Sequence, residues 1–172
     1  MTTTPTVHVE SVLPGRADFT VGEVDAILEA AYLATAADGV LTTEEREAFR
    51  SVASSLRQIA AGGGPSKAKP IADKDLDGLF ERFAVRSDHA DRSERVAAMR
   101  ERLGRTAVRE LAYKIAFAMS LCDLDANDDE AAYDDELIEA FGIDGDRADA
   151  LAAEVYAALD ADLDCDSEAP PR

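Results

Sequence analysis

Apolar residues recur along most of this chain with the spacing of one helix face, and no segment alternates with the period of two typical of strands. The first such pattern begins at Val21, where Val24, Ile27, Leu28 and Ala31 fall at positions i, i+3, i+4 and i+7. The 172 residues suit one domain of ordinary size. The pattern therefore predicts an all-α single domain of about seven helices.

Caps and helix breakers divide the pattern into seven helices. The first is expected to run from Val21 to about Ala37, and Thr42 or Thr43 can cap the second, which ends before a Gly-rich linker at residues 62–70. The other five are a third that buries Leu76, Leu79, Phe80 and Phe83, a fourth capped by Ser87 or Asp88, a fifth capped by Thr106, a short sixth that ends at Gly142, and a seventh that follows Asp144 or Gly145.

The segments outside this pattern are expected to be poorly ordered. Residues 1–20 mix Thr, Val, Pro and Gly and are expected to form a flexible N-terminal arm, with the helical domain at 21–161 and an acidic disordered tail at 162–172. The apolar runs are too short for a membrane span, and no secretory signal is visible. Two cysteines are too few for a disulfide framework, so a cytoplasmic location is expected.

Negative charge is concentrated in the last third of the chain. The net charge is −18, from 36 acidic and 18 basic residues, and residues 115–172 contain 18 of the acidic residues but only Arg147 and Arg172 as basic ones. Such a segment repels a phosphate backbone, which argues against nucleic-acid binding there. Eight arginines lie between residues 82 and 109, but Asp88, Asp91, Glu94 and Glu101 are interleaved with them, which indicates a salt-bridged helical surface.

Two parts of the sequence resemble each other. Residues 31–38 read AYLATAAD and residues 116–123 read AFAMSLCD, with an Ala, an aromatic, a hydroxyl and a final Asp at matching positions. In both, an acidic loop follows, and then a second helix that contains EEREAF in the first copy and DELIEAF in the second. The repeat predicts pseudo-symmetric helix–acidic loop–helix halves.

The second acidic loop is the strongest candidate for a metal site. Oxygen side chains stand at relative positions 1, 3, 5, 7 and 12, which is the pattern that a calcium loop uses. Position 6 is Asp128 where the turn of an EF-hand needs Gly, and position 8 is Glu130 where an aliphatic residue is expected. The alternative is a solvated loop whose acidic residues favour the N-terminus of the next helix. The predicted ligands are Asp123, Asp125, Asn127, Asp129 and Asp134.

The first acidic loop reads as a helix–turn–helix connector when it is taken alone. Gly39 suits the turn, and Glu44 and Glu45 lie in the first turn of the following helix. Pseudo-symmetric packing would bring the two acidic loops together, and Asp38, Glu44 and Glu45 would then add oxygen ligands to a shared cation site.

The segment from Ala30 to Phe49, with its Ala-Asp-Gly and the following Thr-Thr-Glu-Glu-x-x-x-Phe, resembles the TerB (tellurite-resistance) family. The second copy, residues 116–141, has Leu124 in place of the family's Gly, and its loop is longer. The resemblance implies an all-helical, pseudo-symmetric fold with an acidic corner in each half. It also implies a cytoplasmic, metal-binding stress-response module that works with partner proteins at the membrane, without established catalysis.

Two functional interpretations follow. The first is a non-enzymatic helical module of TerB type that binds a divalent cation, with Ca²⁺ favoured by the hard oxygen ligands and Mg²⁺ or Mn²⁺ as other candidates. The second is a metal-independent acidic adaptor that docks a basic protein partner. A homo-oligomer, through pairing of the basic middle with the acidic third of a neighbour, is a further expectation. Cys122 lacks a neighbouring His base, and the chain offers no general base beyond its carboxylates, so no enzymatic activity is expected.

Overall fold

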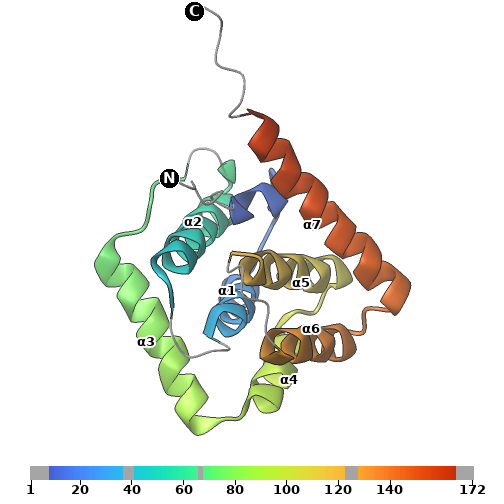
Figure 1. Ribbon diagram of the computed structural model, residues 1–172. Coiled ribbons are helices and arrows are strands. Elements are labelled where there is room, and N and C mark those ends of the chain that lie inside the picture. The colour runs from blue at the N-terminus through green and yellow to red at the C-terminus, as the bar shows by residue number, and fades with distance from the viewer. Residues whose placement is uncertain (1–7, 37–40, 66–67, 123–127, 166–172) are drawn as a thin grey trace, which may run out of the picture.

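The computed structural model describes residues 8–36, 41–65, 68–122 and 128–165, and within these ranges the protein is helical and contains no strand. A single compact domain results, as the helical periodicity predicts (Figure 1). One short 3₁₀ helix precedes seven α-helices: η1 (Val9–Val12), α1 (Val21–Thr35), α2 (Thr43–Ala60), α3 (Asp73–His89), α4 (Arg92–Arg102), α5 (Thr106–Ser120), α6 (Asp128–Phe141) and α7 (Gly145–Cys165).

The helix α1 lies at the centre of the domain and is buried on all sides over most of its length. Every residue from Ala26 to Thr35 is buried, which is more than the single apolar face that the i, i+3, i+4 pattern predicts. In Figure 1, α1 and α5 lie in the middle, and α2, α3, α4, α6 and α7 surround them. A helix in this position must be compatible with an apolar environment all round, and four alanines in α1 allow its neighbours to approach closely.

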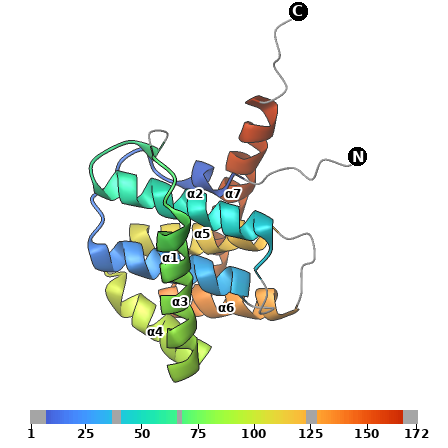
Figure 2. The ribbon, with the colours of Figure 1, turned by 90° about the vertical axis from the view of Figure 1, so that its left-hand side faces the viewer.

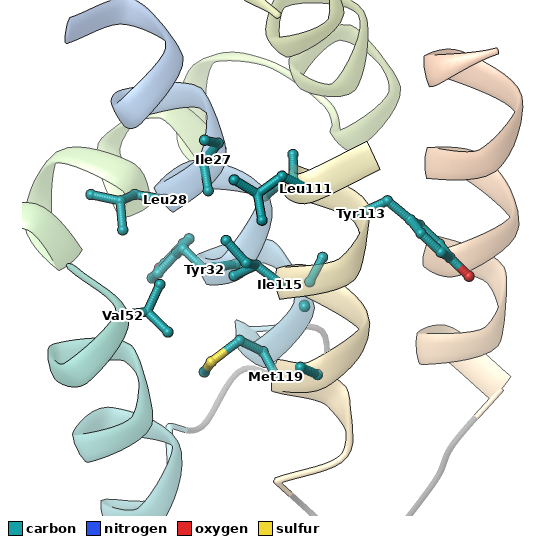
Figure 3. Close-up of a cluster of buried hydrophobic side chains, with 14 of the residues drawn as sticks. Ile27, Leu28, Tyr32, Val52, Leu111, Tyr113, Ile115 and Met119 are labelled. Carbon is teal, nitrogen blue, oxygen red and sulfur yellow. The ribbon is translucent and has the colours of Figure 1, made fainter. Parts of the chain in front are cut away.

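The two central helices, α1 and α5, pack side by side and run in the same direction (Figure 2). Figure 3 shows Ile27 of α1 beside Leu111 of α5, and Tyr32 beside Ile115 one step further along both helices. All four side chains belong to the hydrophobic core. Because α1 and α5 are parallel, their C-terminal ends lie at the same end of the domain.

The helix ends have identifiable caps, and two of the predicted caps are wrong. Thr42, rather than Thr43, caps α2, and Asp144 accepts a hydrogen bond from the backbone N–H of Arg147 at the start of α7. The fourth helix is capped by Asp91 instead of Ser87 or Asp88, because α3 continues through those residues to His89. Thr106 is the first residue of α5, whose N-cap is Arg105 and lacks a side-chain hydrogen bond.

The segments expected to be disordered are partly ordered. In the N-terminal arm, η1 packs on the core and buries Val9, Val12 and Leu13, because these apolar side chains find a surface formed by α2, α5 and α7. The last helix continues to Cys165, beyond the end expected at residue 161. Within the described residues, no helix combines the length and the apolar character that crossing a membrane requires.

Candidate functional site

The ends of the two helix–loop–helix units meet at one corner of the domain. Burial, together with the negative charges of Glu45 and Glu10, raises the pKa of the Cys122 thiol to about 12. Cys122 lies two residues beyond the end of α5, whereas Glu45 belongs to the first turn of α2, so the start of α2 lies close to the end of α5. Glu45 and Cys122 are each close in sequence to one of the two acidic loops, and the loop segments 37–40 and 123–127 themselves lie outside the described residues.

Glu45 is a buried capping residue at this corner. Its Oε2 accepts hydrogen bonds from the backbone N–H of Thr42 at 2.7 Å and from the Thr42 hydroxyl at 3.0 Å. In return, the Thr42 hydroxyl accepts from the Glu45 backbone N–H at 3.2 Å, which completes a capping box. Glu44, the other predicted ligand of this helix, is exposed to solvent. The structure thus gives Glu45 a structural role and leaves the Glu44 carboxylate facing water.

Asp134 lies on α6 and is partly buried against α5. Its Oδ2 accepts a hydrogen bond from the Tyr113 hydroxyl at 3.3 Å. Burial raises the pKa of Asp134 above its usual value, the Tyr113 hydrogen bond partly offsets this, and the charge of Asp135 adds to the increase in pKa. Burial and the nearby carboxylates likewise raise the pKa of Tyr113. The negative charge of Asp134 is therefore unfavourable in the absence of a cation.

The other predicted ligands lie mostly outside the described residues. Asp38, Asp123, Asp125 and Asn127 fall in the two undescribed segments at the corner, and Asp129 belongs to α6 but its side chain is likewise not described. Within the described ranges, no three His, Cys, Asp or Glu side chains gather closely enough to hold a metal ion. Glu44, Glu45 and Asp134 are thus not brought together by themselves, and the predicted site depends on the loop residues.

A second polar feature, a cluster of arginines and carboxylates, lies between α1, α3 and α4. Its centre is Glu29, whose side chain is only 2% exposed. Glu29 accepts hydrogen bonds from Arg86 Nη1 at 2.7 Å, from Arg95 Nε at 3.0 Å and from Arg102 Nη2 at 2.6 Å. A carboxylate this deeply buried would be strongly destabilising without such partners.

Asp25, one helical turn before Glu29, completes this arginine–carboxylate cluster. Its Oδ2 accepts from Arg86 Nη1 at 3.0 Å and from Arg102 Nη1 at 2.6 Å, and its Oδ1 pairs with Arg82. The arginines come from α3 and α4, and both carboxylates come from α1. The cluster therefore ties the two outer helices to the central one.

The interleaved charges predict a salt-bridged surface, and the arginines of this cluster do form ion pairs, but with carboxylates that lie further away in the sequence. The interleaved acidic residues Asp88, Asp91, Glu94 and Glu101 suggest pairing within one segment, whereas the structure pairs the arginines with α1. Asp91 instead caps α4. The sequence contains the signal, because Asp25 and Glu29 stand four residues apart and Glu29 interrupts an apolar run. A carboxylate within such a run requires positively charged partners from elsewhere in the chain.

Comparison of the chain with protein families, with curated proteins and with solved structures gave no match.

Proposed function

We propose that the protein is a non-enzymatic helical module of TerB type that binds a divalent cation, with Ca²⁺ as the favoured ion, where its two acidic loops meet. The observation that carries this proposal is the proximity of Glu45 and Cys122, since these residues lie next to the two acidic segments. Parallel packing of α1 and α5 supports the proposal as well, because it places the C-terminal ends of these two helices at the same end of the domain (Figure 2).

The acidic residues of this corner give a cation a physical role. The segment 123–127 contributes Asp123, Asp125 and Asn127, and Asp38 lies in the first loop. Hard oxygen ligands of this kind suit Ca²⁺, which takes six to eight of them. Bound Ca²⁺ would neutralise carboxylates that otherwise repel one another, and it would also offset the unfavourable charge of Asp134.

Metal binding would act on the packing of α2 and α6. Both helices begin at this corner, and Tyr133 near the start of α6 donates a hydrogen bond to the buried Ala30 carbonyl oxygen at 3.0 Å. A cation held between the loops would fix how these two helix starts lie relative to α1 and α5. The surface offered to a protein partner would change accordingly, which is how a cation-responsive interaction module of the stress-response type would work.

Isothermal titration calorimetry of Ca²⁺ into EDTA-treated protein, with Mg²⁺ in parallel, tests the proposal. Asp125→Asn removes a predicted ligand. Asp146→Asn is the matched control, because Asp146 is exposed in the first turn of α7. That turn lies near the N-terminal end of α5, away from the proposed cation site at its C-terminal end. Arg109 Nη1 on α5 donates to the carbonyl oxygen of Phe141, which stands shortly before α7, at 3.2 Å.

The proposal predicts saturable Ca²⁺ binding that Asp125→Asn removes and Asp146→Asn preserves. Equal loss in both variants would indicate diffuse attraction to an acidic protein, and the absence of any heat would reject the cation site.

A metal-independent acidic adaptor is the second candidate, and the exposed carboxylates of α6 and α7 favour it. The same helix α7 also presents a half-exposed aromatic side chain, Tyr156, which packs edge-on against Phe117. A basic partner could bind this surface without any metal. The adaptor predicts that a lysine-rich peptide binds EDTA-treated protein and that its affinity falls steeply as salt rises. The exposed acidic residues described on these two helices are Asp128, Asp135, Glu139, Asp146, Asp149, Glu154 and Asp160.

A further inference from the structure

A pocket of about 460 Å³ opens beside the arginine–carboxylate cluster, between α3 and α4. Its volume lies within the range of small-molecule sites. Arg86, Arg95 and Arg102 supply its basic lining, and Glu29 lies at its base. The remaining lining residues are Val85, Ala90, Glu94 and Ala98.

The cluster has more positive than negative charge. Four arginines, Arg82, Arg86, Arg95 and Arg102, surround the two carboxylates of Asp25 and Glu29, which leaves a surplus of two positive charges. Glu94 also lines the pocket, but it is exposed, so water screens its charge. This local surplus stands out in a chain whose net charge is −18. It favours a dianionic occupant over a neutral or cationic one.

The geometry of Arg86 gives the pocket hydrogen-bond donors for an anion. Its Nη1 donates to both Asp25 and Glu29, which anchors the guanidinium group on one side. Its Nε and Nη2 have no hydrogen-bond partner among the described residues, and the side chain is 37% exposed. These two nitrogens form the edge of a planar fork that suits two oxygens of a phosphate group. The anchoring lowers the entropic cost of presenting them.

The apolar part of the lining restricts the ligand further. Val85 is 49% exposed and lies next to Arg86 at the pocket, with Ala90 and Ala98 also in its wall. A ligand that combines a phosphate group with a small apolar group would satisfy both kinds of surface. We propose that this pocket binds a phosphate monoester, with its phosphate on Arg86 and its organic group against Val85, Ala90 and Ala98. This site is independent of the proposed cation site.

Calorimetric titration of phenyl phosphate into the protein at constant low ionic strength tests this proposal, with inorganic phosphate as a second probe. Ala98→Glu places a carboxylate in the pocket, whereas Ala97→Glu makes the same change at the neighbouring exposed position, which does not line it. Both positions lie in α4, so the two variants have similar effects on helix stability. Circular dichroism would verify that both fold.

We expect Ala98→Glu to weaken binding of phenyl phosphate by about tenfold or more, because the new carboxylate competes for the same guanidinium group. Ala97→Glu should leave the affinity within about twofold. Arg86→Gln should weaken binding to a similar extent as Ala98→Glu, with Arg57→Gln, an exposed arginine on α2, as its control. Inorganic phosphate should bind more weakly than the ester.

Three results would overturn the proposal. The first is no binding of phenyl phosphate by the wild-type protein at millimolar concentration. The second is equal weakening by Ala97→Glu and Ala98→Glu, which would indicate non-specific attraction. The third is binding of inorganic phosphate without binding of the ester, which would reject the assignment of the organic group to the apolar wall.

Discussion

Replacement of the buried carboxylate Glu29 by Gln should strongly destabilise the fold. The substitution keeps the size of the side chain but removes its negative charge, which three guanidinium groups share. Arg95 is the most affected, because its side chain is only 3% exposed and it cannot turn out to water. Removing one partner of a buried ion pair leaves the other charge uncompensated in a poorly polarisable environment.

The structure sets the size of this effect. Breaking a buried ion pair costs about 3–5 kcal/mol. Arg86 and Arg102 are 37% and 29% exposed, so solvent can compensate them and each adds less than about 1 kcal/mol. The Gln amide oxygen can still accept one hydrogen bond, which reduces the loss. We therefore expect Glu29→Gln to lower the free energy of unfolding by about 3 kcal/mol.

Urea denaturation followed by circular dichroism measures this change, with Glu139→Gln as the matched control. Glu139 is exposed on α6, so its substitution should change the free energy of unfolding by less than about 0.5 kcal/mol. If Glu29→Gln lowered the free energy by no more than the control does, the buried cluster would not hold α3 and α4 to α1, and the reasoning above would be refuted.

Three further predictions concern the cap, the core and the pH dependence. Thr42→Ala should lower the free energy of unfolding by about 1 kcal/mol, and Thr43→Ala by less than about half as much, because only the Thr42 hydroxyl caps α2. Equal losses in urea denaturation would contradict the assigned cap. Ile115→Ala should lower the free energy of unfolding by about 2–5 kcal/mol, because it opens a cavity in a fully buried contact, whereas Val21→Ala, at a position 88% exposed, should lower it by less than about 0.5 kcal/mol. A similar melting temperature for both variants would contradict the packing of α1 on α5. Burial raises the folded-state pKa of Asp134, so in metal-free protein the wild type should lose stability relative to Asp134→Asn as pH rises from about 3.8 through that raised pKa. A difference in melting temperature between the two proteins that does not change with pH would refute this.

The sequence predicted the class of fold because helical periodicity is strong in the helices that keep a polar side, the central helix α5 among them. In α5, the predicted face of Val108, Leu111, Ala112, Ile115 and Met119 is buried as expected. This works because α5 has a polar side, marked by Arg109 and Lys114, which differs clearly from its buried side.

Periodicity is less informative for α1, because this helix is buried all round. The predicted face of Ile27, Leu28 and Ala31 is correct but incomplete, since Ala26, Ala30 and Ala34 are buried as well. Alanine is common both in exposed and in buried helices, so it does not reveal a central helix by itself. Glu29 within this run was the informative residue.

The cap of α4 shows how local signals can compete. Ser87, Asp88 and Asp91 are all good N-cap residues within a short stretch, so sequence alone does not choose among them. The choice is made by α3, whose packing through Phe83 and whose ion pairs through Arg86 extend that helix past Asp88. Long-range contacts of this kind are not visible in local sequence patterns.

The relation between the two halves was predictable in part. The matched segments at residues 31–38 and 116–123 predict pseudo-symmetric halves whose acidic loops meet, and this stays a prediction, although the end of α5 and the start of α2 do lie close together. A shared cation site at these corners remains the proposal, since Asp38 and Asp125 lie outside the described residues.

The most direct test of a cation site shared by the two acidic loops is a Ca²⁺ titration of ¹⁵N-labelled protein followed by its amide resonances. A single site shared by both loops predicts that the resonances of Thr42 to Glu45 and those of Leu121 and Cys122 shift together, with one dissociation constant. Asp38→Asn and Asp125→Asn should each weaken both sets of shifts. Shifts confined to one of these two sets of resonances, or no shifts at saturating Ca²⁺, would contradict the shared cation site.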